Sequence, residues 1–443
     1  MTENGVRETR GACDHLQASD RTPTCRHFAG PLGSDVDYYR WFSGVGLVEV
    51  ELLCVECLAR RRAGESIEIV SICEPCRVVL EDVGIQDGIF GTPEVLVRLE
   101  PTDTTLRETS LPWSSEEIVG IAPIESTHAF WLVVLRDGSV GRLHADSGEV
   151  DDVCSVELPP AEPDHQPWVG HLLTPRLHVS VDARFAAIVH DYGQYGRAYD
   201  LRTGRCTLEL DGGRYHANTV PFSFAFVEHR GRTVAIHRTE WNRLDASDPE
   251  TGDLLTERGP TSYGRGEEPP EHYLDYFHGR LVVSPDGRRV VDDGWVWQPV
   301  GIPRVWDLRR WLETNVWESE EGPRTLTQRW YYWDHGICWL DPDHIALEGI
   351  GDDDDEMIGG VRIFTVAASG IWARELAAFA GPSGRFFSDG RRLFAAGTDG
   401  LTIWEVGTGA LVARIDGFTP SWQHSHGREL AEISGQRLLR WRY

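Results

Sequence analysis

Short apolar runs separated by turn residues fill the chain from about residue 93 to residue 443. The runs have the length and the alternation of β-strands, and Gly, Asp and Pro recur between them. Residues 284–287 (SPDG) and 388–390 (SDG) are typical of tight hairpin turns. Few stretches have helical periodicity. The pattern therefore predicts a mainly β region.

A unit recurs within this region: an aromatic or apolar residue ends a strand, and an acidic residue and a Ser/Thr-Gly turn follow. The copies lie near residues 143, 199, 244, 306, 364, 404 and 441. Their spacing of about 37 to 62 residues is typical of propeller blades, each of which is a four-stranded sheet. The repeats predict a seven-bladed β-propeller over residues 93–443.

The last repeat lacks room for a complete blade. Trp441 ends a third strand, and only two residues follow it. A fourth strand must come from elsewhere, and residues 94–99 (EVLVRL) can supply it. Closure by this strand would cover an edge that would otherwise be exposed.

Residues 93–443 resemble a WD-repeat propeller. The phrases Val305-Trp306-Asp307 and Ile403-Trp404-Glu405 carry the resemblance, together with residues 284–287. It implies a rigid platform that binds other proteins, usually without catalysis. Because one fold serves many functions, this role is an expectation that the fold alone does not establish.

Cysteines are concentrated before the propeller, where six of the nine lie. Cys54 and Cys57 form one C-x-x-C pair, Cys73 and Cys76 form another, and 15 residues separate the pairs. This spacing predicts a main site for one structural zinc ion, since each pair can aim two thiolates at one tetrahedral ion. Residues 45–53 and 66–72 read as strands, so we expect a hairpin-based zinc ribbon. Two redox-active or merely buried pairs are the alternative.

Two further pairs, Cys13 with His15 and Cys25 with His27, could hold a second zinc ion. Either these four residues form their own Cys2His2 site, or the four pairs interleave, the first with the third and the second with the fourth. Ordinary loop residues are the plainer interpretation. We expect a zinc-binding module over residues 13–90, after a disordered N-terminus of residues 1–12.

The opening Cys13-Asp14-His15-Leu16, followed by C-x-x-C pairs, loosely resembles the zinc finger of ubiquitin-specific proteases. The resemblance covers at most residues 13–76. It implies recognition of the free C-terminus of a ubiquitin-like protein.

Charge and composition narrow the range of partners. The net charge of −27 opposes extended contact with nucleic acid or an anionic membrane. No apolar run is long enough to span a bilayer, and residues 1–10 are polar, so we expect a soluble cytoplasmic protein. All 43 basic residues are arginine. A G+C-rich genome explains the absence of lysine, and selection within a lysine-modifying pathway is the alternative.

Aromatic residues between two predicted blades are candidates for partner binding. Residues 307–329 are longer than an ordinary connection, and we expect an added partner-binding loop whose deletion leaves folding intact. The candidate residues are Trp311, Trp317, Trp330, Tyr331, Tyr332 and Trp333. Wedges between blades are the alternative role for such rings. The acidic run 352–356 could attract a cation or a basic partner, but a solvated hairpin tip is the simpler interpretation.

Common local catalytic motifs are absent from the sequence, among them G-x-S-x-G, the P-loop and H-E-x-x-H. The sequence favours a non-enzymatic interaction scaffold or adaptor with protein partners. One alternative is a recognition subunit of a lysine-modifying, ubiquitin-like pathway. Another is a propeller hydrolase that acts on a polar or sugar-like substrate through carboxylates in the central channel. Converging carboxylates at the channel would favour the hydrolase, and an aromatic rim would favour partner binding.

Overall fold

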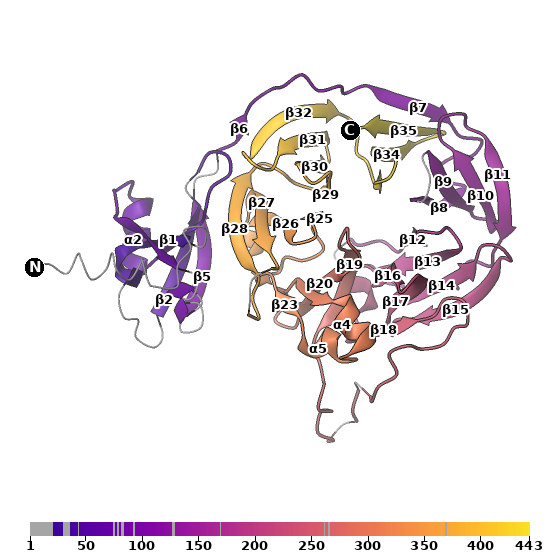
Figure 1. Cartoon of the computed structure of the whole chain (residues 1–443), viewed down its shortest axis with the longest axis horizontal. Helices are drawn as coiled ribbons and strands as arrows, with labels where there is room; N and C mark the ends of the chain where they lie inside the picture. The colour runs from indigo at the N-terminus through magenta and orange to yellow at the C-terminus, as the bar shows by residue number, and fades with distance from the viewer. Residues whose placement is uncertain are drawn as a thin grey trace, which may run out of the picture.

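A computed structural model describes most of the chain. It covers residues 21–29, 36–42, 44–73, 76–77, 79–80, 84–91, 94–125, 129–168, 170–260, 262–264, 266–367 and 370–443. A small N-terminal part and a ring of β-sheets make up the protein (Figure 1). The N-terminus predicted to be disordered, residues 1–12, lies outside the described residues. Among the described residues no helix has the length and apolarity to cross a membrane.

The N-terminal module contains a five-stranded sheet and the helix α2 (Val55–Arg62). Along the sheet, the strands are β4 (Ile69–Cys73), β1 (Arg21–Cys25), β3 (Glu51–Leu53), β2 (Val36–Phe42) and β5 (Gly84–Gly91). The short 3-10 helix η1 (Arg26–Ala29) follows β1. The expected hairpin ribbon is wrong, because β1 lies between β3 and β4. The apolar residues of these elements form one small core.

The rest of the chain forms consecutive sheets of mostly antiparallel strands. The first three contain β8 (Ile118–Pro123), β9 (Phe130–Leu135), β10 (Ser139–His144) and β11 (Val150–Ser155); β12 (Thr174–Val179), β13 (Phe185–Asp191), β14 (Tyr195–Asp200) and β15 (Arg205–Asp211); and β16 (Phe224–His229), β17 (Arg232–Glu240) and β18 (Arg243–Ser247). The fourth contains β19 (Phe277–Val283), β20 (Arg289–Val296), β21 (Val300–Gly301), β22 (Arg304–Asp307), β23 (Arg324–Thr325) and β24 (Arg329–Trp330).

The last three sheets complete the ring. They contain β25 (Ile337–Asp341), β26 (His344–Ile350), β27 (Ile358–Thr365) and β28 (Arg374–Ala380); β29 (Arg385–Ser388), β30 (Arg392–Gly397), β31 (Gly400–Glu405) and β32 (Ala410–Asp416); and β33 (Trp422–His424), β34 (Glu429–Ser434) and β35 (Arg437–Arg442). Short helices lie in the connections: η2 (Ala217–Thr219), α4 (Leu308–Glu313), α5 (Glu318–Glu321) and η3 (Asp354–Glu356). The first strand of each sheet lies toward the centre of the ring (Figure 1). A mainly β protein built as a ring of sheets is confirmed.

Both faces of each sheet pack against a neighbouring sheet, which explains the continuous apolar runs. On β13, Ile188 packs with Leu132 of the preceding sheet. The adjacent Ala187 and Val189 pack with Phe224 of the following sheet. Side chains of a strand alternate between its faces, so consecutive apolar residues serve two separate cores.

The strand that closes the ring is β7 (Leu106–Ser110), which pairs with β35. The prediction that residues 94–99 supply the closing strand is therefore wrong, because a later segment does so. That segment contributes β6 (Leu96–Val97), a parallel addition to β32 of the preceding sheet. In β7 only Thr109 is buried, so an alternating apolar pattern could not reveal this strand.

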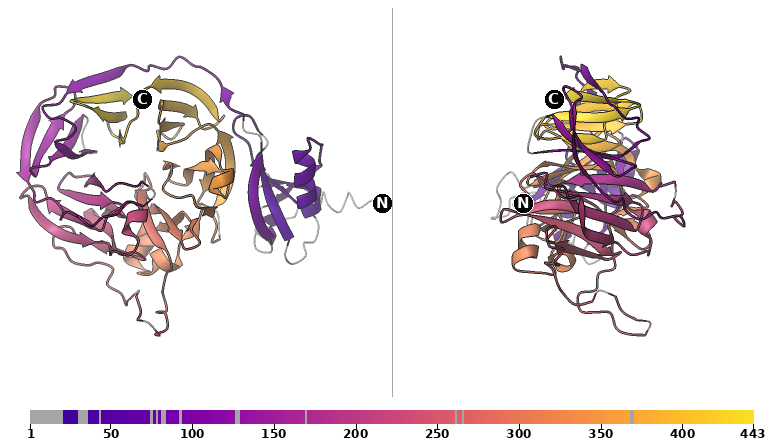
Figure 2. Two further views of the ribbon diagram at one scale, coloured as in Figure 1. Left: turned by 180° about the vertical axis from the view of Figure 1, so that it is seen from behind. Right: turned by 90° about the vertical axis from the view of Figure 1, so that its right-hand side faces the viewer.

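The module lies against the outside of the ring, beside the sheet of β25 to β28 (Figures 1 and 2). Val48 and Ala378 exchange two backbone hydrogen bonds with N···O distances of 3.0 and 2.9 Å. Phe42 and Val50 pack with Ile350 and Ala378 in a shared apolar cluster. The module is thus docked through both backbone and side-chain contacts.

Candidate metal centre and interaction surfaces

Four potential metal ligands meet where β1 and η1 face the start of α2. Cys25 ends β1, and His27 follows it in η1. Cys54 is the N-cap of α2, and Cys57 lies in its first turn. The pairing of β1 with β3 brings these two segments together, because Cys54 directly follows β3.

The geometry of this cluster fits a single metal ion. One ligand atom from each residue lies within 4.8 Å of all the others. Nδ1 of His27 is 3.3 Å from Sγ of Cys54 and 3.4 Å from Sγ of Cys57. A tetrahedral site with thiolate and imidazole ligands has ligand-to-ligand distances of about 3.6 to 3.8 Å, which follow from its usual bond lengths. The cluster is therefore close to the arrangement that an ion requires, and small shifts of the side chains would admit one.

The surroundings of the thiol groups affect their pKa values. The backbone N–H of Cys54 donates a hydrogen bond to Sγ of Cys25 over 3.3 Å. Burial raises the pKa of Cys25 to about 12, and neighbouring thiols contribute. Burial also raises the pKa of Cys57, while the charge of Arg60 acts in the opposite direction. A bound cation would reverse this preference for the protonated thiols, because ligation requires thiolates.

The structure groups the predicted ligands differently from the two sites that the sequence predicts. Cys54 and Cys57 of the expected main site meet Cys25 and His27 of the expected second site. Within the described part of the chain, Cys73 and Cys76 do not join this cluster. Cys73 is buried and Cys76 is half-buried. The two remaining candidates, Cys13 and His15, lie outside the described residues, so the second ion stays a prediction.

A buried ion cluster joins the module to the ring, and no pattern in the sequence indicates it. Arg40 on β2 donates hydrogen bonds to Asp352 and, over 2.8 Å, to Glu375. Arg362 on β27 adds a second guanidinium, 3.6 Å from Asp352 and 3.8 Å from Glu375. Burial alone would lower the pKa of Arg40, but the two carboxylates outweigh burial and raise it. Two arginines thus balance two carboxylates at the interface.

The cluster also corrects the interpretation of the acidic run 352–356. Asp352 is only 8% exposed and is paired with Arg40. The following residues turn outward in η3 and are exposed at 354–356. The run is therefore a hairpin tip only in part, and its first carboxylate is structural.

The six candidate aromatic residues fall into three groups. Trp311 and Tyr332 are buried, at 2% and 7% exposure. Trp317 and Trp333 are half-buried. Trp330 and Tyr331 are exposed, at 42% and 62%. Only the last two are exposed enough to contact a partner, and Trp311 packs in a core between two sheets.

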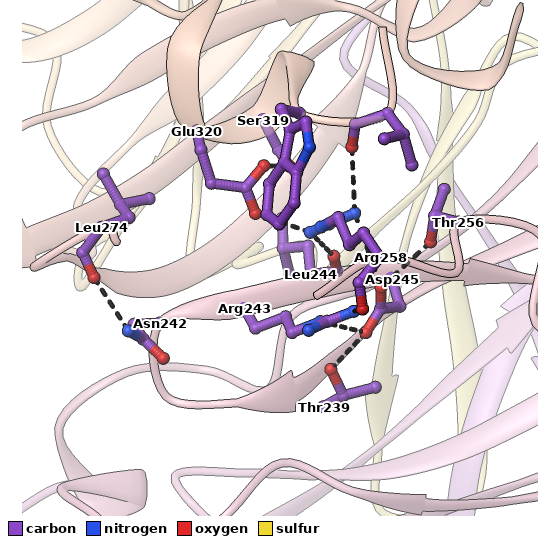
Figure 3. Close-up of polar contacts among 12 residues, drawn as sticks. Thr239, Asn242, Arg243, Leu244, Asp245, Thr256, Arg258, Leu274, Ser319 and Glu320 are labelled. Carbon is purple, nitrogen blue, oxygen red and sulfur yellow. Dashed lines mark hydrogen bonds and ion pairs between the residues drawn. The ribbon is translucent and has the colours of Figure 1, made fainter. Parts of the chain in front are cut away.

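The segment over residues 307–329 is packed into the ring, contrary to the expected added loop. Trp311 on α4 belongs to the apolar core that includes strands β16 and β17. Arg258 pairs with Glu320 on α5 over 2.6 Å and with Asp245 on β18 over 3.5 Å, and both partners are buried (Figure 3). The guanidinium of Arg258 also lies over the ring of Trp317. Deleting this segment would expose a core and leave buried charges unpaired.

Carboxylates near the inner strands are paired with arginines. Asp191 lies 3.0 Å from Arg176 on β12, and Asp334 lies 3.0 Å from Arg280 on β19. Tyr192 also donates a hydrogen bond to Asp334 from across the ring. A third pair, Asp293 with Arg329, is at 3.5 Å, and Asp293 is 1% exposed. These carboxylates are engaged in structural pairs, and Asp293 is closed to a substrate.

Comparison with protein families and with curated proteins finds no match to either. Among solved structures, a chain of "Crystal Structure of Mitotic Checkpoint Complex" is similar, with 14% sequence identity and a TM-score of 0.44. The match covers 80% of this chain and 96% of that chain.

Proposed function

We propose that the chain is a non-enzymatic interaction scaffold, a seven-bladed β-propeller with a zinc-stabilised module docked on its rim. Each of the consecutive sheets from β8 to β35 would be one blade, and β7 would complete the last. The WD-repeat resemblance of residues 305–307 and 403–405 supports this assignment. A rigid closed ring offers loops from several blades on one face, which suits it to hold a protein partner.

Zinc is the ion that best fits the cluster of Cys25, His27, Cys54 and Cys57. Three thiolates and one imidazole complete a closed tetrahedral set with no position left for substrate, as in structural sites. The small core of the module supplies limited stability, and a bound ion would add to it. The role of the ion would therefore be to hold the module in shape for docking.

The contrast between the ring centre and the loop surface is the observation that carries the scaffold proposal. A hydrolase needs carboxylates free to act on a substrate, whereas Asp191 and Asp334 are neutralised by arginines. Large aromatic and apolar side chains are exposed on connections, among them Tyr215, Trp297 and Tyr331. Exposed rings of this kind are typical of partner surfaces.

Affinity capture of the full chain under native conditions tests the proposal, with cross-linking to map where a captured protein touches. We expect a specific partner whose cross-links fall on the loops of one face of the ring. A double variant, Trp330→Ala with Tyr331→Ala, should reduce capture and leave the melting temperature unchanged. Turnover of glycoside or ester substrates that is lost in Asp334→Asn would instead favour the hydrolase and refute the scaffold.

A further inference from the structure

Strands and connections of the second to fifth sheets carry an aromatic cluster that neither the metal centre nor the docking of the module uses. Its floor is a stack of three rings. Phe277 lies on Trp295 with centroids 4.3 Å apart and planes 10° apart, and Trp295 lies on Trp333 at 5.0 Å and 15°. The indole N–H groups of both tryptophans donate hydrogen bonds to the buried Thr219, which fixes the stack.

Two exposed rings form walls beside this floor. Tyr215, in the connection between β15 and β16, is 49% exposed, and Trp297, in the turn after β20, is 43% exposed. Trp241, in the turn between β17 and β18, closes the side next to Tyr215 at 5.3 Å. Because adjacent strands alternate in direction, these connections lie on one face of the ring. The rings together form an aromatic cage that opens to solvent.

The side chain of His216 occupies the cage. Its imidazole lies 4.6 Å from the ring of Tyr215 and 4.8 Å from that of Trp297, each nearly perpendicular to it. It also meets Phe277 edge-on at 5.7 Å. Among the described residues the imidazole has ring contacts but no hydrogen-bond partner. The imidazole is a flat, nitrogen-containing ring surrounded by aromatic rings, and it occupies the place that a planar cation would take.

The backbone of His216 is in a region that non-glycine residues adopt uncommonly. Its φ is +51°, in the left-handed region that glycine adopts most easily. Burial lowers the pKa of His216, so its ring is neutral at physiological pH and leaves the cation-binding capacity of the cage unused. Gln298, next to Trp297, also has a positive φ of +111°. Backbone strain of this kind gathers where a ligand is bound or a segment moves.

We propose that this cage binds an arginine side chain of a protein partner and that His216 fills it until the partner arrives. The inference rests on the proposed scaffold function, for which it names the chemistry of the partner. Charge favours a basic partner, because the chain carries a net charge of −27. The exposed Asp275 lies near Tyr273, whose pKa is raised by burial and by this carboxylate, and the phenol of Tyr215 contributes to the same shift. A planar guanidinium matches both the shape of the imidazole and the faces of the rings.

Titration with N-acetyl-arginine amide, followed by tryptophan fluorescence at constant ionic strength, tests the cage without a partner. N-acetyl-citrulline amide has the same shape without the charge and serves as the matched probe. We expect saturable binding of the arginine probe and binding of the citrulline probe weaker by roughly fivefold or more, as loss of a cation–π contact implies. Equal binding of both probes, or none of the arginine probe, would overturn the inference.

Three variants separate the cage from the general surface. Trp297→Ala should weaken arginine binding by roughly fivefold or more, while Trp168→Ala, which removes a ring of similar exposure outside the cage, should not. His216→Gly should strengthen binding, because it removes the occupant and suits the left-handed backbone. Weaker binding in His216→Gly would refute the role of His216. A partner captured by the chain without arginine binding would refute the cage alone and leave the scaffold standing.

Discussion

Arg40 offers the sharpest test of how the module is held on the ring. The substitution Arg40→Met keeps the apolar stem of the side chain and removes the guanidinium. Asp352 and Glu375 would then lose one of the two guanidinium groups that balance them, and Arg362 would face both carboxylates. Removing one partner of a buried ion pair costs about 3 to 5 kcal/mol. Because the module has its own core, we expect this cost to appear as undocking and not as unfolding of the ring.

Hydrogen exchange at the docked edge gives the readout. The amides of Val48 and Ala378 are bonded only across this interface. In Arg40→Met the free energy of opening at these amides should fall by about 3 to 5 kcal/mol, up to the whole docking free energy. Amides inside β26 and β27 should keep their protection.

Two further variants make the result decisive. Arg60→Met removes an exposed ion pair with Glu65 and should change stability by less than about 1 kcal/mol. Adding Asp352→Asn to Arg40→Met leaves Arg362 opposite Glu375 and should restore part of the protection. If exchange at Val48 and Ala378 is no faster in Arg40→Met than in Arg60→Met, the ion cluster does not hold the module.

The remaining predictions concern the ion, the packed segment and one buried carboxyl. Zinc analysis should show one equivalent fewer in Cys57→Ser than in the wild type, and Cys154→Ser, outside the cluster, should lose none. Trp311→Ala should destabilise the ring by about 3 to 5 kcal/mol in urea unfolding, whereas Trp330→Ala should cost less than about 1 kcal/mol. Burial raises the pKa of Asp293 from 3.8 to about 6, so the folded state binds a proton at this carboxyl more tightly than the unfolded state does. The stability that this proton adds is present at low pH and is lost as the pH rises through 6. Relative to Asp293→Asn, the wild type should therefore gain up to about 3 kcal/mol of unfolding free energy between pH 7 and pH 4, and a pH-independent difference would contradict this.

The ring could be foreseen because its signal is local and repeated. Each sheet has its own apolar strands and turns. Short sequence patterns such as those at residues 305–307 and 403–405 therefore indicate a sheet without information from the other sheets. The closing strand carried no such signal. In β7 Thr109 is buried and Leu106 is half-buried, and both pair with residues of β35 that lie more than 300 positions away.

The metal centre was foreseeable in kind but not in its pairing. The C-x-x-C of Cys54 and Cys57 is a local motif, whereas its partners depend on which strands lie side by side. The parallel pairing of Thr24 on β1 with Leu52 on β3 brings Cys25 next to Cys54. This pairing joins residues that are 28 positions apart and is stabilised by the shared core. The spacing of the cysteines in the sequence therefore cannot predict it.

Contacts between distant segments explain the remaining differences. Arg40 and Asp352 are 312 residues apart, and the acidic run that contains Asp352 does not indicate Arg40 as its partner. Arg258 and Glu320, which fix the packed segment, lie in two separate connections. Such buried pairs form only where the fold excludes water around both charges. In the sequence, their residues therefore cannot be distinguished from ordinary charged surface residues.

The N-terminal part does more than add a domain, because its chain spans the seam of the ring. Residues 45–48 contact the sheets that contain β28 and β32, then β6 adds to β32 and β7 completes the sheet of β35. The module and the segment that leaves it therefore contact the last three sheets in order, including the one that contains the C-terminus. Ordering a closing strand costs conformational entropy, and docking the module beforehand shortens the free chain that must be ordered. A metal ion in the module would thereby stabilise closure of the ring from a distance, which gives a structural reason for placing the two side by side in one chain.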